Sequence, residues 1–445
     1  MRRIVENVLE KMLSTTVQNA GWAIRPSLSD LSFSPALLIH EHVFSLQQQG
    51  RTVYHMALEE SPFPVHKILQ EQLAAQVAKS AYIPSVGLFE LKTLALQYFS
   101  GKLKLPPGNY RVIIGAGCPA LVTSLQVALE GDLLFPVPSW VSYYPHTLVT
   151  GDKVIKIHTG MEDGYKLKPE VLEEQVRKAR DSGYMPRKLF LNYPNDPAGI
   201  TYAPDELEAI ARVARANGIL IISDETYGLV NFSGDHESIS RYYPEGTVVV
   251  AGLSRHMALG GFRFAVSIIP ENMERLFQTL RSITGETSAN AASPLQYGVL
   301  SALQGYGELE EYIRSCTGIH RIIIQYLKGK LLQMGIAYPD ASGAYFLYPD
   351  FSPFARSLKK KYGVSTSEAL AESLLLERQV AALPGTAFGD RNEHLRLRLS
   401  ALDYNGRAAL EYREKFGLAN EEHFVEACCP RIEEGMRRLS QYFLD

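Results

Sequence analysis

Residues 110–131 read YRVIIGAGCPALVTSLQVALEG, and this stretch decides the fold class. The apolar run YRVII is typical of a buried strand. The run PALVTSLQVALEG is typical of a helix that proline opens and glycine closes. Only the small residues GAG and one cysteine separate the two patterns. The stretch therefore predicts a strand–turn–helix unit of an α/β fold.

The sequence that follows repeats this alternation. DLLFPVPSW and DKVIKIHT predict strands, PEVLEEQVRKARDSG a helix, KLFLNYP a strand and PDELEAIARVARANG a helix. GILIISDE, GTVVVAGLS and FRFAVSII predict three further strands. Such alternation is typical of a mostly parallel sheet covered by helices on both faces. In these sheets, ligands bind at the carboxyl ends of the strands.

The C-terminal part has a different pattern. GIHRIIIQYLKGKLLQMG predicts a long helix, SGAYFLYPDF and HLRLRLSALD predict strands, and EEHFVEACCPRIEEGMRRLSQYF predicts a closing helix. A chain of 445 residues is also longer than one core usually accommodates. We expect a large domain over residues 76–325 and a smaller α+β domain over residues 326–445. The N-terminal segment, residues 1–75, is expected to join the small domain.

Composition excludes several classes of function. A formal net charge of −3, with 21% charged residues, gives no reason to expect nucleic acid or an acidic membrane surface as a partner. The N-terminal run IVENVLEKML has charges at helical spacing rather than the apolar stretch of a signal peptide, and no run is long enough to cross a bilayer. The four cysteines form no CxxC pair or Cys/His cluster, so we expect no disulfide framework and no metal. Reduced thiols fit a cytoplasmic protein.

Five segments at expected strand ends carry residues suited to an anion or a planar ligand. The turn GAGCP places small residues at a helix N-terminus, where free amides favour a phosphate. Trp140 in PVPSWVSYYP follows a strand, and its flat ring could stack on a planar ligand. NYPNDPAGITY is a loop after a strand, and Asp224 ends the strand ILIISD. The segment GLSRHMALGGFRFA carries Arg255, His256 and Arg263.

In the order in which they occur, these segments resemble motifs of the class I/II aminotransferases of fold type I, which bind pyridoxal phosphate. The resemblance covers nearly the whole chain. YIPSVG, beginning at Tyr82, resembles the family's YxPxxG segment, and GAGCPAL resembles its phosphate-binding NGATEAL-type turn. PSWVSY resembles PxYPxY, PNDPAG resembles PNNPTG, and SDETYG resembles the DExY motif. SGAYFLYPD resembles the GAFYLFPD-type strand.

The resemblance implies a role for each matching residue. Asp224 would pair with the protonated pyridine nitrogen, which makes the cofactor an electron sink. Tyr227 would donate a hydrogen bond to the ring hydroxyl oxygen, and Trp140 would stack on the ring. The residues implied in phosphate binding are Ala116, Gly117, Cys118, Ser254 and Arg263.

The resemblance also implies partners. Family sites are assembled at a dimer interface, so Tyr82 would reach the phosphate in the neighbouring subunit of a homodimer. The substrate would be an amino acid or a keto acid whose carboxylate is bound by an arginine. We prefer Arg396 of HLRLRLSAL for this role. Arg398 lies two residues further along the same strand, on the same face, and is the alternative.

The first departure from the family is Asp196 in PNDPAG. It replaces the asparagine that family members place against the ring hydroxyl. An ionised carboxylate beside a phenolate-like oxygen is repulsive unless one of them holds a proton. Asp196 is therefore expected to affect the tuning or the occupancy of the cofactor site.

The second departure is at the lysine that family members bond to the cofactor. Their pattern, [GS]-x-S-K followed by seven residues and an arginine, reads GLSR here, with Arg255 in place of the lysine and Arg263 at the matching spacing. Arginine stays protonated in proteins and cannot form a useful Schiff base. The chain contains no lysine between Lys188 and Lys328 that could substitute. We therefore expect no covalent link to the cofactor.

Three interpretations of this sequence remain. We favour an enzyme that binds pyridoxal or pyridoxamine phosphate non-covalently, with His256 or Tyr227 in place of lysine as the base. His256 is equally consistent with a solvent-facing or structural histidine of a loop. The second interpretation is a non-catalytic homologue that binds a cofactor or metabolite for regulation or assembly. The third, a dinucleotide-binding dehydrogenase, has only GAGCPA in its favour and lacks an acidic residue at the right distance.

Overall fold

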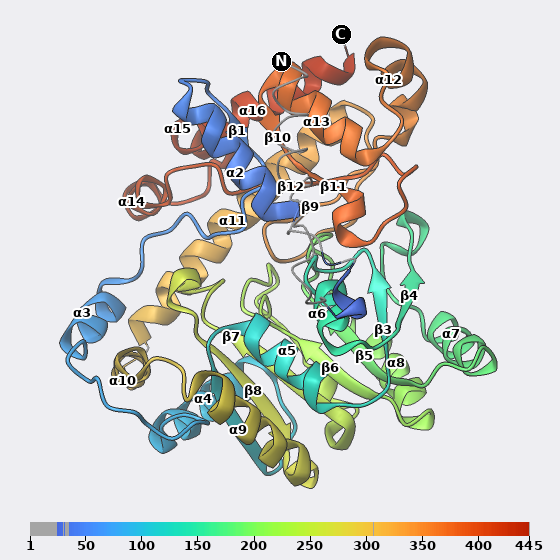
Figure 1. Ribbon diagram of the computed structural model, residues 1–445. Helices are drawn as coiled ribbons and strands as arrows, with labels where there is room; N and C mark the ends of the chain where they lie inside the picture. The colour runs from blue at the N-terminus through green and yellow to red at the C-terminus, as the bar shows by residue number, and fades with distance from the viewer. Residues whose placement is uncertain (1–24, 30, 32–34, 306, 445) are drawn as a thin grey trace, which may run out of the picture.

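A seven-stranded sheet forms the centre of the larger part of the protein (Figure 1). The computed structural model describes residues 25–29, 31, 35–305 and 307–444. In spatial order the strands are β2 (Tyr110–Gly115), β8 (Ala265–Pro270), β7 (Thr247–Gly252), β6 (Leu220–Asp224), β5 (Pro186–Asn192), β3 (Asp132–Val137) and β4 (Val154–His158). Neighbouring strands are parallel, except that β8 is antiparallel to both β2 and β7. The predicted mostly parallel sheet is confirmed.

Helices cover both faces of this sheet. Successive side chains of a strand point to opposite faces, so Val112 of β2 packs with α4 and α10 whereas Ile113 packs with α5 and α9. The covering helices are α4 (Phe89–Leu103), α5 (Cys118–Ala128), α6 (Tyr143–Thr150), α7 (Pro169–Asp181), α8 (Pro204–Ala216), α9 (Glu274–Ser288) and α10 (Ser293–Leu303). Burial on both faces explains why the strands read as continuous apolar runs.

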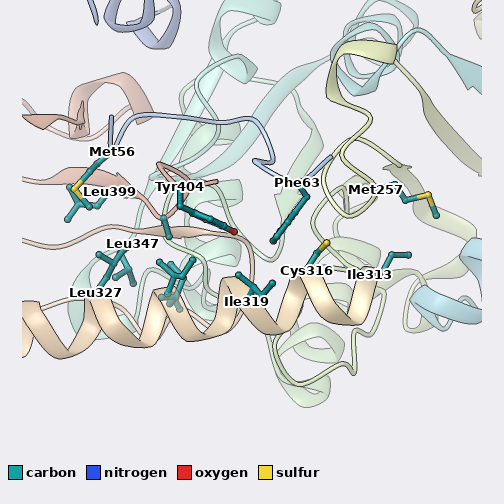
Figure 2. Close-up of a cluster of buried hydrophobic side chains, with 14 of the residues drawn as sticks. Met56, Phe63, Met257, Ile313, Cys316, Ile319, Leu327, Leu347, Leu399 and Tyr404 are labelled. Atoms are coloured by element: carbon teal, nitrogen blue, oxygen red, sulfur yellow. The ribbon is translucent and has the colours of Figure 1, made fainter. Parts of the chain in front are cut away.

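The long helix α11 (Gly307–Gln333) connects this part to the C-terminal part, which lies above the sheet in the view of Figure 1. Its buried side chains, such as Ile319 and Leu327, belong to one hydrophobic cluster with Leu347 and Leu399 (Figure 2). The expected domain boundary after residue 325 falls inside this helix, and the division of the chain into domains stays a prediction.

Two small sheets and a group of helices make up the C-terminal part. One sheet has the order β11 (Leu383–Pro384), β12 (Leu397–Ser400), β9 (Phe346–Leu347), and the other pairs β1 (Tyr54–His55) with β10 (Val380–Ala381) in parallel. The helices are α12 (Ala355–Tyr362), α13 (Ser367–Arg378), α14 (Gly406–Phe416), α15 (Glu421–Cys428) and α16 (Pro430–Leu444). N-terminal to the seven-stranded sheet in the chain, α2 (Pro35–Gln48) contacts β11, and α3 (Lys67–Ala75) packs against α10.

One predicted strand is shorter in the structure, and one predicted helix lies outside the described residues. The predicted strand SGAYFLYPDF is regular only over Phe346–Leu347, because Ala344 has a φ of 56°, outside the extended region. The helical pattern IVENVLEKML lies outside the described residues. In the described part of the chain, no helix is long and apolar enough to cross a membrane.

Candidate functional site

A cavity of about 330 Å³ lies at the carboxyl ends of the central strands, where parallel sheets bind their ligands. Most of the residues expected in the site line it: Cys118, Trp140, Asp196, Asp224, Tyr227, Ser254, Arg255 and Arg263. The remaining lining side chains include His40 of α2 and the two acidic residues Glu59 and Glu60. A second cavity, of about 390 Å³, lies around Pro186 at the amino end of β5, and none of the residues expected in the site line it.

Asp224 is the last residue of β6, and its carboxylate is held from two sides. The Tyr143 hydroxyl donates to Oδ2 at 2.7 Å, and the Thr226 backbone amide donates to Oδ1 at 3.1 Å. The Thr226 hydroxyl also donates to Oδ1. These donors fix the direction in which the Asp224 carboxylate faces the cavity. Sequence reasoning did not assign Tyr143, although it lies in the same PSWVSYY segment as Trp140.

The next residue, Glu225, anchors this strand end from behind. Its side chain is fully buried and accepts hydrogen bonds from Ser223 at 2.7 Å and from Ser238 at 2.6 Å. The imidazole Nε2 of His236 lies 2.9 Å from its other oxygen. These contacts fix the backbone from which Asp224 projects into the cavity.

The turn between β2 and α5 forms a cradle with Arg263. Gly117 has a φ of 90°, and a Cβ placed on it would lie only 2.3 Å from Nη2 of Arg263. Only glycine therefore allows the guanidinium to approach the backbone so closely. Ser254 lines the cavity beside Arg263, and α5 begins at Cys118, so its first amides are free for an anion. Ala116 lies in the turn but not on the cavity wall.

Cys118 and Trp140 line the part of the cavity next to Asp224. The Cys118 thiol lies 3.8 Å from Oδ2 of Asp224 and 3.3 Å from the hydroxyl of Thr226. Burial raises the pKa of Cys118 well above its usual value, so it stays a thiol. The ring of Trp140 is steadied by an edge contact with Tyr143, at 5.3 Å between centroids.

Arg255, which the sequence pattern predicts at the lysine position, forms hydrogen bonds within the protein. Its Nη1 donates to the backbone oxygen of Glu59 at 2.6 Å and to the hydroxyl of Tyr345 at 3.4 Å. Its guanidinium lies over the ring of Tyr227, 5.0 Å from the centroid. Burial raises the pKa of Tyr227 well above its usual value, so this phenol keeps its proton and is suited to donate rather than to act as the base.

Asp196 is paired with the alternative carboxylate arginine. Its Oδ1 accepts from Nη1 of Arg398 at 2.9 Å, and Oε1 of Glu59 lies 2.9 Å from Nη2 of the same guanidinium. Burial raises the pKa of Asp196, and the charge of Arg398 opposes this rise. Oδ2 of Asp196 is buried and has no hydrogen-bond partner within the described residues. The repulsion expected at this position is thus offset by Arg398.

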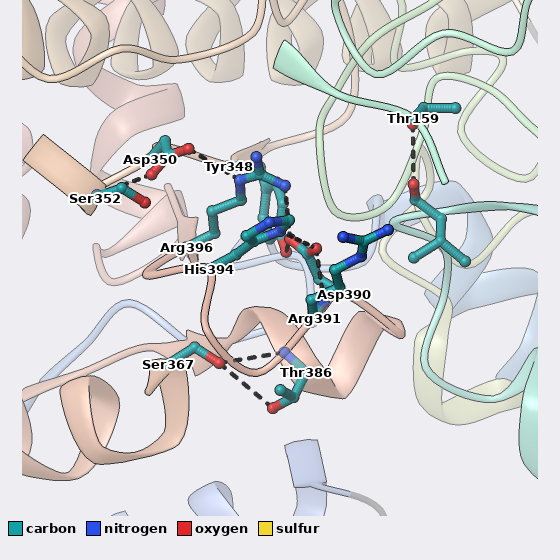
Figure 3. Close-up of polar contacts among 11 residues, drawn as sticks. Thr159, Tyr348, Asp350, Ser352, Ser367, Thr386, Asp390, Arg391, His394 and Arg396 are labelled. Carbon is teal, nitrogen blue, oxygen red and sulfur yellow. Dashed lines mark hydrogen bonds and ion pairs between the residues drawn. The ribbon is translucent and has the colours of Figure 1, made fainter. Parts of the chain in front are cut away.

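The preferred carboxylate arginine, Arg396, lies beside Asp350 and Asp390 (Figure 3). Its Nε donates to Asp350 at 3.1 Å and its Nη1 to Asp390 at 3.0 Å, and it does not line the cavity. Two residues along a strand amount to about 6.7 Å, which is enough to move a side chain out of the site. Arg398 does not line the cavity either, but it contacts the lining residues Asp196 and Glu59, and the choice between the two arginines stays a prediction.

The structure places His256, the candidate base, outside the cavity. His256 is buried beneath the loop, does not line the cavity, and has its Nε2 3.3 Å from the hydroxyl of Tyr98. Burial lowers its pKa to about 3. This environment favours the interpretation of His256 as a structural histidine.

This burial makes His256 a source of acid sensitivity. Its folded pKa lies below the usual 6.5, so the unfolded chain takes up the proton first, and stability is lost as pH falls below 6.5. Between pH 6.5 and pH 5 the loss due to this residue is about 2 kcal/mol. Urea unfolding at pH 7 and pH 5 should show a smaller acid-induced loss for His256→Gln than for the wild type. The same substitution at His423, which is exposed on α15, should leave the loss unchanged; equal losses in all three proteins would contradict the assignment.

Two remaining expectations concern partners and metals. Tyr82 is 88% exposed and lies outside the cavity of its own chain, so its role across a dimer interface stays a prediction. Among the described residues, no group of histidine, cysteine, aspartate or glutamate side chains is arranged to hold a metal ion.

Comparison with known proteins gives the family. The model for "Aminotransferase class I and II" matches residues 53–407. The aspartate aminotransferase of Bacillus subtilis strain 168 is 28% identical over 83% of this chain and 92% of its own length. The aspartate/prephenate aminotransferase of Thermus thermophilus is 28% identical over 85% and 94% of the two chains. The solved aspartate aminotransferase from Thermus thermophilus with maleate covers 94% of this chain and 99% of its own, with a TM-score of 0.79 and 23% identity.

The fold and the strand-end cavity thus define a protein of the aminotransferase class. The chain belongs to the family of class I and II aminotransferases. Members of this family use pyridoxal phosphate.

Proposed function

We propose that this protein binds pyridoxal or pyridoxamine phosphate without a covalent bond and acts on an amino acid or a keto acid. The observation that carries the proposal is the cradle at the end of β2, where Gly117 allows Arg263 to lie against the turn that opens α5. A guanidinium beside free helix amides suits a phosphate. Asp196 Oδ2, buried without a partner among the described residues, leaves an acceptor for a ligand.

Each remaining part of the cavity would have a task. Asp224 would pair with the protonated ring nitrogen, and Tyr227 would donate a hydrogen bond to the ring hydroxyl oxygen. Trp140 would cover the ring and exclude water from it. When bound, the cofactor supplies an electron-withdrawing ring that stabilises negative charge on the substrate. Arg398 takes over the role of carboxylate arginine in this proposal.

The same proposal includes a homodimer with shared sites. Its basis is the exposure of Tyr82 in the YIPSVG segment, outside the cavity of its own chain. An exposed tyrosine hydroxyl on one subunit would complete the phosphate site of the other.

A non-catalytic homologue, binding cofactor or metabolite for regulation or assembly, is the second candidate. One observation favours it: the guanidinium at the lysine position is engaged by Glu59 and Tyr345. Lysine moves protons in this family because a desolvated amine can release one, whereas arginine keeps its proton. Binding of pyridoxamine phosphate without any turnover of amino or keto acids would support this candidate.

The cradle is tested by titrating pyridoxamine phosphate into wild type and Arg263→Gln by calorimetry. Loss of a hydrogen bond to a charged group costs about 1.5–3 kcal/mol. We therefore expect affinity to fall roughly 10- to 150-fold. The matched control is Arg212→Gln on α8, whose side chain is 74% exposed, and it should bind like the wild type. No binding by the wild type, or equal binding by Arg263→Gln, would reject the proposed function.

A further inference from the structure

Arg398 is fully buried and does not itself line the cavity. Its Nη1 is used by Asp196, and its Nη2 faces Glu59. The side chain of Glu59 is 27% exposed and lines the cavity, so it lies between Arg398 and the space that a ligand would enter. A ligand in the cavity therefore meets a carboxylate where a carboxylate-binding arginine would be expected.

Glu59 is held in this place through its backbone. Its carbonyl oxygen accepts from Nη1 of Arg255 at 2.6 Å and from the hydroxyl of Tyr345 at 3.2 Å. Arg255, the residue at the family's lysine position, thus fastens the segment from which Glu59 reaches Arg398. The two unusual features of the cavity belong to one arrangement.

The two carboxylates on Arg398 are not equivalent. Asp196 is 1% exposed and accepts a well-aligned hydrogen bond at 2.9 Å. Oε1 of Glu59 is equally close to Nη2 but is not aligned as a hydrogen-bond acceptor, and Nη2 donates to the backbone oxygen of Ala57 at 3.3 Å. An aligned carboxylate interacts more strongly with a guanidinium than a misaligned one. Glu59 is therefore the partner that an incoming carboxylate can replace.

We propose that Glu59 is an internal competitor for the carboxylate site. Its side chain takes the place on Arg398 that the carboxylate of an amino or keto acid would take, so such acids bind only when Glu59 turns away toward solvent. This inference rests on the proposed function in that it assigns the substrate carboxylate to Arg398. Glu59 thereby sets which ligands the cavity accepts. The apparent affinity for a carboxylate is its intrinsic affinity multiplied by the fraction of molecules in which Glu59 has left Arg398.

The test is calorimetric titration of maleate, a small dicarboxylate, into wild type, Glu59→Gln and Glu59→Ala. We expect maleate affinity to rise by roughly tenfold or more in both variants, since the internal competitor is lost. Glu60→Gln is the matched control: Glu60 lines the same cavity and carries the same charge, but it forms no ion pair with Arg398. Circular dichroism of each variant establishes that it is folded.

The outcomes separate this inference from the proposed function. Maleate affinity that is unchanged in both Glu59 variants overturns the inference. An equal gain in Glu60→Gln also overturns it, because the effect would then be one of overall cavity charge. Pyridoxamine phosphate is titrated into the same proteins: if it fails to bind while the Glu59 variants gain maleate affinity, the proposed function fails and the role of Glu59 stands.

Discussion

Arg398→Met is expected to lower the free energy of unfolding by about 3–5 kcal/mol, the usual cost of removing one partner from a buried ion pair. Arg398 is fully buried between Asp196 and Glu59. Without the guanidinium, Asp196 would be left charged and 99% buried, or would have to take up a proton, because burial raises its pKa. Methionine keeps most of the side-chain volume, so the loss reports on charge rather than on a cavity.

Urea unfolding at pH 7 measures this loss. The control is the double variant Arg398→Met with Asp196→Asn, in which no carboxylate remains buried without its partner. Glu59 is partly exposed and can turn toward water. The double variant should therefore recover most of the lost stability. A single variant as stable as the wild type would mean that the Arg398–Asp196 pair contributes nothing to the fold.

Arg255→Lys is expected to create a covalent link to the cofactor, which we propose that the wild type lacks. Arg255 lines the cavity, and burial opposes charge on its side chain, so an amine at this position would be desolvated. Desolvation lowers the pKa of a lysine and frees its lone pair to attack an aldehyde, whereas the carboxylates of Glu59 and Asp196 act in the opposite direction. Borohydride reduction in the presence of pyridoxal phosphate, followed by mass spectrometry, should find pyridoxyl-lysine at position 255. Absence of the adduct in a folded variant would show that the cavity has diverged beyond this one position.

Combining this change with Asp196→Asn is expected to add little. The sequence alone predicts repulsion between an ionised Asp196 and the ring hydroxyl oxygen of the cofactor. In the structure, Asp196 is the hydrogen-bonded partner of Arg398. Its charge is thus already offset, and replacing it would leave the arginine without its best-aligned partner.

The sequence predicted the fold well because its signals are local. The run 110–131 forms β2, the turn and α5 as expected, and Asp224 ends β6 at the edge of the cavity. Strand periodicity and a helix-opening proline depend on neighbouring residues, so they can be read from one chain. Motif order then brought most of the expected lining residues together.

The sequence is least informative where a side chain's direction depends on distant contacts. Arg396 and Arg398 share a strand face, and only their partners, Asp350 for one and Asp196 for the other, decide which lies by the cavity. His256 follows Arg255 directly, yet the loop turns its ring into the core. Glu59 lies in a segment without a motif, and its position on Arg398 follows from packing across 339 residues of sequence.

Borohydride reduction of the wild-type protein distinguishes non-covalent binding of the cofactor, which we propose, from a covalent link. The protein is incubated with pyridoxal phosphate, native mass spectrometry records the bound cofactor, and reduction and digestion then locate any adduct. Arg263→Gln serves as the background for labelling of surface lysines. We expect a bound cofactor in the native protein and no pyridoxyl-lysine within residues 76–325 above that background. A reduced adduct at a lysine of this region, absent from Arg263→Gln, would contradict it.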